Sequence, residues 1–268
     1  MLNFLHNFHP QPILISFGNI HIYWYGFFIV LAILAALTIT LKLAKKFNIS
    51  QNKIFDLGFW MVVIGIIGAR IYHVLLELGY YLENPLDIFK IWQGGLAIHG
   101  ALIAGVLTLL FFVRKEKVDF WLTTAIIVPG LALAQAIGRW GNYFNQELFG
   151  SPTDLAWGIP IDLINRPIEF ISAEFFHPTF FYESLGSLII FAILMFLLLK
   201  IVREKKNYEI VLISYAILYS LLRFLLEFIR IDQTPFLLGL RFPQIVSLVI
   251  IIISIVYLAT KNRQTKTI

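Results

Sequence analysis

Apolar residues fall into seven long runs, separated by shorter polar connections. The runs cover residues 22–41, 54–76, 96–113, 120–137, 180–201, 210–228 and 243–259. Each is close to the roughly 20 apolar residues that a helix needs to cross a bilayer. The pattern therefore predicts an all-α integral membrane protein with about seven transmembrane helices.

Composition supports a single polytopic membrane domain over residues 1–268. Hydrophobic residues make up 59% of the chain and charged residues 14%, and the mean hydropathy is +0.81. An ordinary soluble domain is about 25% charged. The chain contains no cysteine, which excludes an internal disulfide framework, a zinc–thiolate site and a cysteine nucleophile. Any thiol in the chemistry must come from the substrate.

Basic residues crowd into every second connection and into the C-terminal tail. They are Lys42, Lys45, Lys46, Lys53, Arg114, Lys115, Lys117, Lys200, Arg203, Lys205, Lys206, Lys261, Arg263 and Lys266. The positive-inside rule predicts that this side is cytoplasmic. An odd number of spans then places the N-terminus outside and the C-terminus inside. The net charge of +5 therefore reflects topology, and we expect no nucleic-acid partner.

Six arginines lie within the spans or on the predicted outer side, where the topology rule disfavours them. They are Arg70, Arg139, Arg166, Arg223, Arg230 and Arg241. Charge in a membrane is costly and usually functional, and arginine binds phosphate in a bidentate manner better than lysine does. Each arginine could instead pair with a glutamate and staple helices together. As a set, they favour a binding site for an anion.

The connection at 138–179 is the longest predicted outer segment, and it is rich in proline and glycine. We expect it to form a small extracytoplasmic head. Its first residues, Gly-Arg-Trp-Gly-Asn-Tyr-Phe-Asn-Gln-Glu, place Arg139, Asn142 and Glu147 at the outer mouth of the fourth span. On a helix Arg139, Asn142 and Tyr143 would share a face, because residues three and four apart are neighbours.

The sixth span carries a polar stripe that consists of Tyr219, Arg223, Glu227 and Arg230. At 3.6 residues per turn all four would lie on one helical face. Such a stripe must face the bundle or a wet cavity. Glu227 could hold both arginines in a salt-bridge ladder. We favour the alternative, in which one arginine is left to bind the ligand.

Three further segments contain candidate residues. His99 lies between glycines early in the third span, and it is either a structural residue or a group that transfers protons near neutral pH. The segment His-Pro-Thr-Phe-Phe-Tyr-Glu ends at Glu183, one turn inside the fifth span. Tyr25, in Tyr-Trp-Tyr-Gly, is by itself typical of an aromatic interface belt. The six histidines do not show metal-ligand spacing.

Together these segments resemble the prolipoprotein diacylglyceryl transferases of bacteria, over nearly the whole chain. The resemblance implies transfer of the diacylglyceryl group of phosphatidylglycerol to the lipobox cysteine of a preprolipoprotein, which is the first step of lipoprotein maturation. The products would be a thioether and glycerol 1-phosphate. It also implies a site at the extracytoplasmic face of the cytoplasmic membrane, with the lipid and the lipobox signal peptide as partners. No cofactor is expected, because the lipid is itself the activated donor.

The resemblance also implies which residues form the site. They are Tyr25, His99, Arg139, Asn142, Glu147, Gly150, Tyr219, Arg223, Glu227, Arg230 and Gln244. Arg139 and Arg223 would stabilise charge on the departing phosphate, and His99 would be the general base, with Tyr25 as a weaker candidate. Ala101 and Trp140 depart from the family pattern, which affects the shape of the pocket without removing a polar group.

A membrane transporter or flippase for an anionic lipid or solute is the alternative function. Arginines within the membrane could mark the path of an anion. The chain shows no internal repeat, however, and its polar residues gather on the predicted outer half. A transporter would place its site nearer the middle of the membrane.

Overall fold

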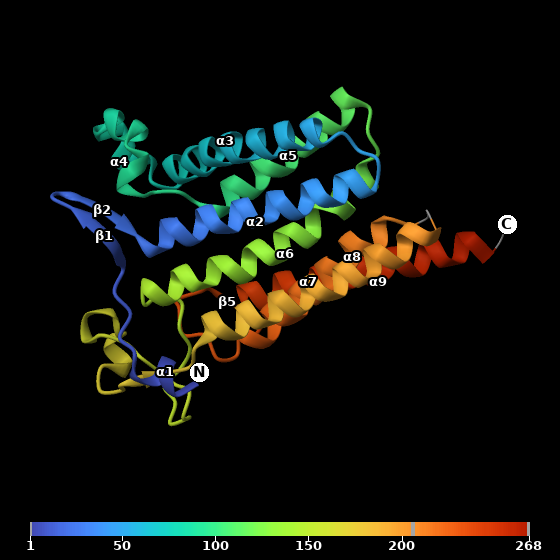
Figure 1. The fold of residues 1–268 in the computed structure, drawn as a ribbon. Coiled ribbons are helices and arrows are strands. Elements are labelled where there is room, and N and C mark those ends of the chain that lie inside the picture. The colour runs from blue at the N-terminus through green and yellow to red at the C-terminus, as the bar shows by residue number, and fades with distance from the viewer. Residues whose placement is uncertain (1, 205–206, 267–268) are drawn as a thin grey trace. The chain divides into compact units, whose positions relative to one another are not determined.

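The computed structural model describes residues 2–204 and 207–266 (Figure 1). Lys205 and Lys206, which belong to a predicted inner connection, lie outside the described residues. Seven of the described helices are long and apolar enough to cross a membrane. They are α2 (Trp24–Lys46), α3 (Gln51–Leu76), α5 (Ile98–Glu116), α6 (Phe120–Phe144), α7 (Thr179–Glu204), α8 (Glu209–Leu226) and α9 (Phe242–Lys266). The predicted fold class is confirmed.

Several helices extend beyond the apolar runs that predicted them. Helix α2 continues through Lys45 and Lys46, because lysine favours helix and its long side chain can reach the membrane surface. Helix α6 continues to Phe144, so the segment 138–144 is helical. The irregular region between α6 and α7 therefore begins at residue 145 and not at 138, and we call residues 145–178 the head.

The remaining elements are short. Three two-stranded antiparallel sheets form from β1 (Ile13–Phe17) with β2 (Ile20–Tyr23), β3 (Ile159–Pro160) with β4 (Phe175–Phe176), and β5 (Phe236–Leu237) with β6 (Leu240–Arg241). Short helices are α1 (Leu2–Asn7), α4 (Leu78–Glu83), η1 (Pro85–Phe89), η2 (Ile91–Gln93), η3 (Leu163–Asn165) and η4 (Ile168–Phe170).

The chain divides into two compact units. One comprises the residues up to Ile39 and from Ile127 onward, and the other comprises Thr40–Ile126. In the second unit α3 and α5 lie side by side (Figure 1). Gly68 and Gly100 face each other there, and a Cβ atom on either one would overlap the other's backbone. Small residues thus allow the close helix packing that is common in membranes.

Arg70 organises the connection from α3 to α5 in the second unit. Its buried guanidinium donates hydrogen bonds to the carbonyl oxygens of Asp87, Ile88, Gly94 and Gly95. A Cβ atom on Gly95 would lie 2.5 Å from the guanidinium, so glycine is required at this position. Because the guanidinium of Arg70 donates its hydrogen bonds to backbone carbonyls, we assign Arg70 a structural role and not a place in the anion site.

In the first unit α8 packs against α7 on one side and α9 on the other (Figure 1). Leu222 of α8 fills the space that Gly186 of α7 leaves open, since a Cβ atom on that glycine would lie 2.6 Å from the leucine methyl groups. The head has its own apolar core, which consists of Leu5, Tyr143, Phe149, Ile159, Ile161, Phe176 and Phe180. This core joins α1, the last turn of α6 and the first turn of α7.

Candidate functional site

A cluster of charged side chains lies where α6 and α8 end and α7 begins. At its centre is Glu183, whose side chain is only 6% exposed. Arg139 Nε contacts Glu183 Oε2, while Arg223 Nη1 and Arg230 Nη1 lie 3.1 and 3.3 Å from Glu183 Oε1. One buried carboxylate therefore gathers three guanidinium groups from distant parts of the chain.

Two further carboxylates extend the cluster. Glu227, whose side chain is fully buried, pairs with Arg223 Nη2 at 2.9 Å and with Arg241 Nε at 2.8 Å. Asp232 pairs with Arg230 Nε at 2.7 Å. Burial acts to raise the pKa of Asp232, but the hydrogen bond from Arg230 and the nearby arginines outweigh it and hold that pKa below its usual value. Asp232 is therefore ionised at neutral pH.

The arginines of the cluster differ in how far they are exposed. The side chains of Arg139 and Arg223 are 23% and 20% exposed, whereas those of Arg230 and Arg241 are 3% and 11% exposed. Arg241 also donates to the backbone carbonyls of Arg230 and Asp232. Arg139 and Arg223 can thus meet a ligand, while Arg230 and Arg241 are locked into the protein.

The expectation of one polar helical face in the sixth span is wrong in part. Helix α8 ends at Leu226, so Glu227 and Arg230 lie in the turn that follows the helix. The turn directs Arg230 toward Glu183 and Asp232, and Glu227 takes Arg241 as its second partner. The salt-bridge ladder on Glu227 alone does not form.

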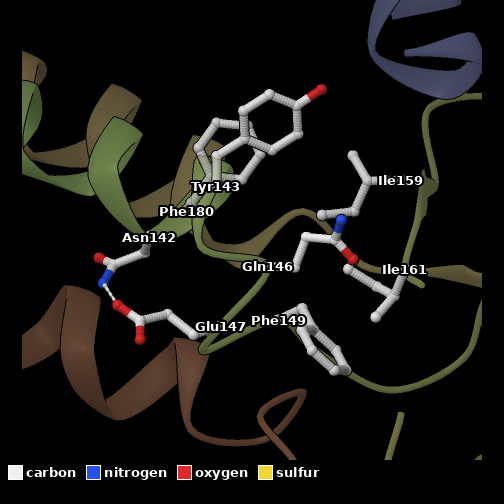
Figure 2. A pocket seen from close by; sticks show the side chains of 8 residues that line it. All are labelled: Asn142, Tyr143, Gln146, Glu147, Phe149, Ile159, Ile161 and Phe180. Carbon is white, nitrogen blue, oxygen red and sulfur yellow. Dashed lines mark hydrogen bonds between the residues drawn. The ribbon is translucent and has the colours of Figure 1, made fainter. Parts of the chain in front are cut away.

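Asn142 and Glu147 adjoin the cluster. Asn142 Nδ2 donates to Glu147 Oε1 at 2.7 Å, and Arg139 Nη1 donates to Asn142 Oδ1 at 3.4 Å. Figure 2 shows this pair pointing away from Gln146, which turns toward the head. Arg139, Asn142 and Tyr143 all lie on α6. The Tyr143 ring stacks on Phe180 in the head core at 4.4 Å.

The cleft beside Asn142 and Glu147 is small. It leaves essentially no room for even a water-sized molecule, and Phe149, Ile159 and Phe180 are among the residues that line it (Figure 2). Small-molecule pockets usually hold roughly 300–1,000 Å³. The cleft therefore marks the joint between α6 and the head, and it is too small to enclose a phospholipid.

Tyr25 lies in the first turn of α2, beside the last turns of α6. A Cβ atom on Gly141 would lie 2.9 Å from the Tyr25 ring, so this glycine allows the two helices to approach. The Tyr25 hydroxyl interacts electrostatically with Glu147 and Arg139. Next to it, Trp24 stacks on Phe144 at 4.5 Å. The structure thus places Tyr25 beside Arg139 and Glu147.

Gly150 has a packing role. A Cβ atom there would lie 2.8 Å from His177 Cβ and 2.9 Å from the carbonyl oxygen of Ile229. Its own N–H donates to the carbonyl of His177 at 2.9 Å. Gly150 therefore joins the head to the start of α7 and to the turn after α8, where a larger residue would force them apart.

Gln244 and Tyr219 lie at the edges of the cluster. Gln244 Oε1 accepts a hydrogen bond from the N–H of Arg241 at 3.0 Å, as the third residue of a helix does in a capping box. Its Nε2 is buried and has no hydrogen-bond partner among the described residues. Tyr219 lies one turn before Arg223 on α8, and its ring stacks on Tyr215 at 5.7 Å.

His99 is the one predicted site residue in the second unit. It is the second residue of α5 and is exposed, and its ring centre lies 5.9 Å from that of Tyr72. The other predicted site residues all belong to the first unit.

Three members of the cluster were absent from the predicted site: Glu183, Asp232 and Arg241. Glu183 carried a signal, because a carboxylate one turn inside an apolar span needs a partner. Arg241 was one of the six arginines that favoured an anion site, whereas Asp232 stands in an ordinary polar connection. Only the folded chain brings these two residues to Glu227 and Arg230.

Comparison with known proteins agrees with this geometry. Residues 12–260 match the family model for prolipoprotein diacylglyceryl transferase. A phosphatidylglycerol–prolipoprotein diacylglyceryl transferase from Synechococcus elongatus is 42% identical over 245 residues, which are 90% of this chain and 84% of the relative. The protein of the same name from Parasynechococcus marenigrum is 45% identical, over 83% of this chain and 81% of its own length. The one from Synechocystis is 41% identical, over 94% of this chain and 92% of its own length. The chain belongs to the prolipoprotein diacylglyceryl transferase family.

Proposed function

We propose that this protein transfers the diacylglyceryl group of phosphatidylglycerol to the lipobox cysteine of prolipoproteins. The observation that supports it most directly is the pair of partly exposed arginines, Arg139 and Arg223, which the buried Glu183 holds together. This arrangement suits a lipid phosphate at the end of a helical bundle. The relatives that are more than 40% identical to the chain over the aligned residues are named for this reaction.

In the proposed step the cysteine thiolate attacks the terminal carbon of the diacylglyceryl group. A carbon–sulfur bond forms, and the bond from that carbon to the phosphate oxygen breaks. The oxygen keeps the electron pair, so glycerol 1-phosphate leaves with one more negative charge than the phosphodiester had. The proton of the thiol passes to a base. Because the lipid supplies the leaving group, no cofactor is required.

The cluster suits a departing phosphate because two of its arginines remain partly exposed. The side chains of Arg139 and Arg223 are 23% and 20% exposed. Fixed donors directed at developing charge stabilise the transition state more than the ground state. The buried ion pairs of Arg230 and Arg241 stabilise the cluster, and the two partly exposed arginines contact the phosphate.

The base must act on a thiol whose usual pKa is about 8.5, so little thiolate exists at neutral pH. His99 is our candidate, and Tyr25 is the second. General bases contribute about 10²–10⁴-fold to a rate. If His99 is the base, His99→Gln lowers kcat by a factor in that range and changes the pH profile of kcat/KM. An unchanged rate and profile would remove His99 from the mechanism.

We place the site at the extracytoplasmic face of the bacterial cytoplasmic membrane. The lysine-rich connections alternate along the chain with the connection that forms the head, and the positive-inside rule assigns them to the cytoplasm. The head and the arginine cluster then meet the secreted part of a lipobox signal peptide. This distribution of basic residues also argues against a nucleic-acid partner.

The test uses purified protein in detergent with phosphatidylglycerol and a peptide that contains a lipobox cysteine. Mass spectrometry detects the diacylglyceryl thioether. Arg139→Ala should lower kcat by about 10²–10³-fold, as loss of an oxyanion donor does. Arg139→Lys should also be impaired, because lysine cannot form the bidentate contact.

A folded, lipid-binding protein that forms no thioether would contradict the proposal. Flux of an anionic lipid or solute through reconstituted vesicles would then test the transporter alternative.

A further inference from the structure

A second layer of polar side chains lies one helical turn from the arginine cluster, on the side away from the head. Three residues form it: Gln135 four positions from Arg139 on α6, Ser187 four from Glu183 on α7, and Tyr219 four from Arg223 on α8. Residues four apart share a helical face, and one turn advances about 5.4 Å. Because the three members of the cluster meet in ion pairs, the polar layer faces the same interior.

The three helices are in contact at this depth. Ser184 Oγ of α7 donates to the carbonyl oxygen of Ala136 on α6 at 2.7 Å. Gly186 of α7 lies directly against Leu222 of α8. The layer is therefore enclosed by packed helices.

Two atoms of this layer have no hydrogen-bond partner within the part of the chain that the structure describes. Ser187 is 1% exposed, and its Oγ is unpaired among the described residues. A serine within a helix often bonds the carbonyl four residues earlier, but this one does not. Gln135 contacts the Tyr215 hydroxyl, and its buried Oε1 is also unpaired in the part of the chain that is described. Unpaired buried polar groups cost free energy, which a suitable ligand would recover.

The layer can offer hydrogen-bond donors to a ligand. The Ser187 hydroxyl is one donor. If the Gln135 amide rotates half a turn about its last bond, its oxygen accepts from Tyr215 and its NH₂ group faces the interior. The Tyr219 hydroxyl is a third donor. The ligand therefore needs acceptor atoms, one turn away from an anionic group.

We propose that this layer binds the ester carbonyl groups of the diacylglyceryl moiety, an inference that rests on the function proposed above. When the phosphate lies at Arg139 and Arg223, the ester carbonyls lie a few bonds farther toward the acyl chains, which is the direction of Ser187. The two layers then hold the glyceryl carbon between them and fix it for attack. Because the unpaired atoms are buried in the lipid-free chain, lipid entry includes side-chain rotations that open the layer.

The experiment compares diacyl phosphatidylglycerol with its dialkyl ether analogue, which has the same headgroup and chains but no carbonyl groups. Purified protein is offered an equal mixture, and native mass spectrometry measures the ratio of bound lipids. The unmodified protein should retain the diester roughly three- to tenfold over the diether, as expected for one or two hydrogen bonds. Ser187→Ala and Gln135→Leu should each reduce this preference, and the double variant should abolish it.

Ser254→Ala is the matched control, because Ser254 is a buried serine on α9 that lies about three turns deeper than Gln244. It should keep the full preference. Equal retention of the two lipids by the unmodified protein would overturn the proposal, as would full preference in the double variant. Because the readout is binding, a diester preference without any thioether product would support this layer while contradicting the proposed transfer reaction.

Discussion

At the scale of residues, the site depends on one carboxylate that forms ion pairs with three arginines. Glu183 contacts Arg139 from α6, Arg223 from α8 and Arg230 from the turn after α8. A carboxylate so deeply buried is costly unless it is paired. The three guanidinium groups together offset that cost, and the ion pairs hold two of these groups where a phosphate can reach them. Glu183 is therefore a positioning residue.

Glu183→Gln should weaken both stability and lipid binding. The neutral amide would leave three arginines close together without their shared counter-charge. Removal of one partner from a buried ion pair costs about 3–5 kcal/mol, which chemical denaturation can measure. Among the molecules that remain folded, KM for phosphatidylglycerol should rise as Arg139 and Arg223 lose their fixed positions.

Glu209→Gln provides the control for that substitution. Glu209 is a buried glutamate at the other end of α8, where it pairs with Lys261. Its loss should reduce stability without changing KM. If Glu183→Gln gave the same unchanged KM, Glu183 would be a structural residue only.

At the scale of elements, the entry to α7 is joined to the head by a chain of hydrogen bonds. Trp157 Nε1 donates to the Tyr182 hydroxyl at 2.8 Å, and that hydroxyl lies 3.3 Å from His177 Nδ1. If the hydroxyl donates to His177, that nitrogen must be unprotonated. Burial lowers the pKa of His177, which also favours the neutral ring. Burial therefore favours a neutral histidine at this joint.

This joint should weaken in mild acid. Since the folded-state pKa of His177 is depressed, its contribution to stability is complete above the unfolded pKa of about 6.5. The contribution declines as the pH falls below that value toward the folded pKa. Thermal unfolding of the unmodified protein between pH 7.5 and 5 should show this loss, and His177→Asn should show a smaller dependence. Equal pH dependence in the two proteins would contradict the assignment.

The sequence predicted the elements better than their ends. Seven apolar runs predicted the seven spanning helices because a bilayer requires that length of apolar helix. The end of α8 at Leu226 was not predictable, because residues 227–230 have no proline or glycine. The turn there is stabilised by ion pairs to Glu183, Asp232 and Arg241, which lie far away in sequence or outside the spans. The helix propensities of single residues do not reflect such distant contacts.

The same reason explains which site residues the sequence revealed. Arg139 and Arg223 stand out because charge is rare in apolar spans. Asp232 does not stand out, because charge is common in connections. The sequence could not divide the arginines into exposed and buried pairs either, since exposure depends on packing between helices.

At the scale of the whole molecule, the distribution of lysines makes the orientation testable. The connections that carry the lysines alternate with those that carry the head and the arginine cluster. If the positive-inside rule applies, the head faces outward and the N-terminus does also. Because the chain contains no cysteine, single cysteines can report on this without any change to the rest of the sequence. Asp154 in the head and Asn52 in the first turn of α3 are exposed and suit this purpose.

In spheroplasts, whose cytoplasmic membrane is sealed, a membrane-impermeant maleimide should label Asp154→Cys at once. Asn52→Cys should react only after detergent opens the membrane, because the lysines around it hold that connection in the cytoplasm. The reverse pattern would place the arginine cluster on the cytoplasmic side. A secreted thiol could not reach the lipid phosphate there, so this result would contradict the proposed reaction as well as the predicted orientation. Labelling of both positions in sealed spheroplasts would instead contradict the odd number of spans between the two connections.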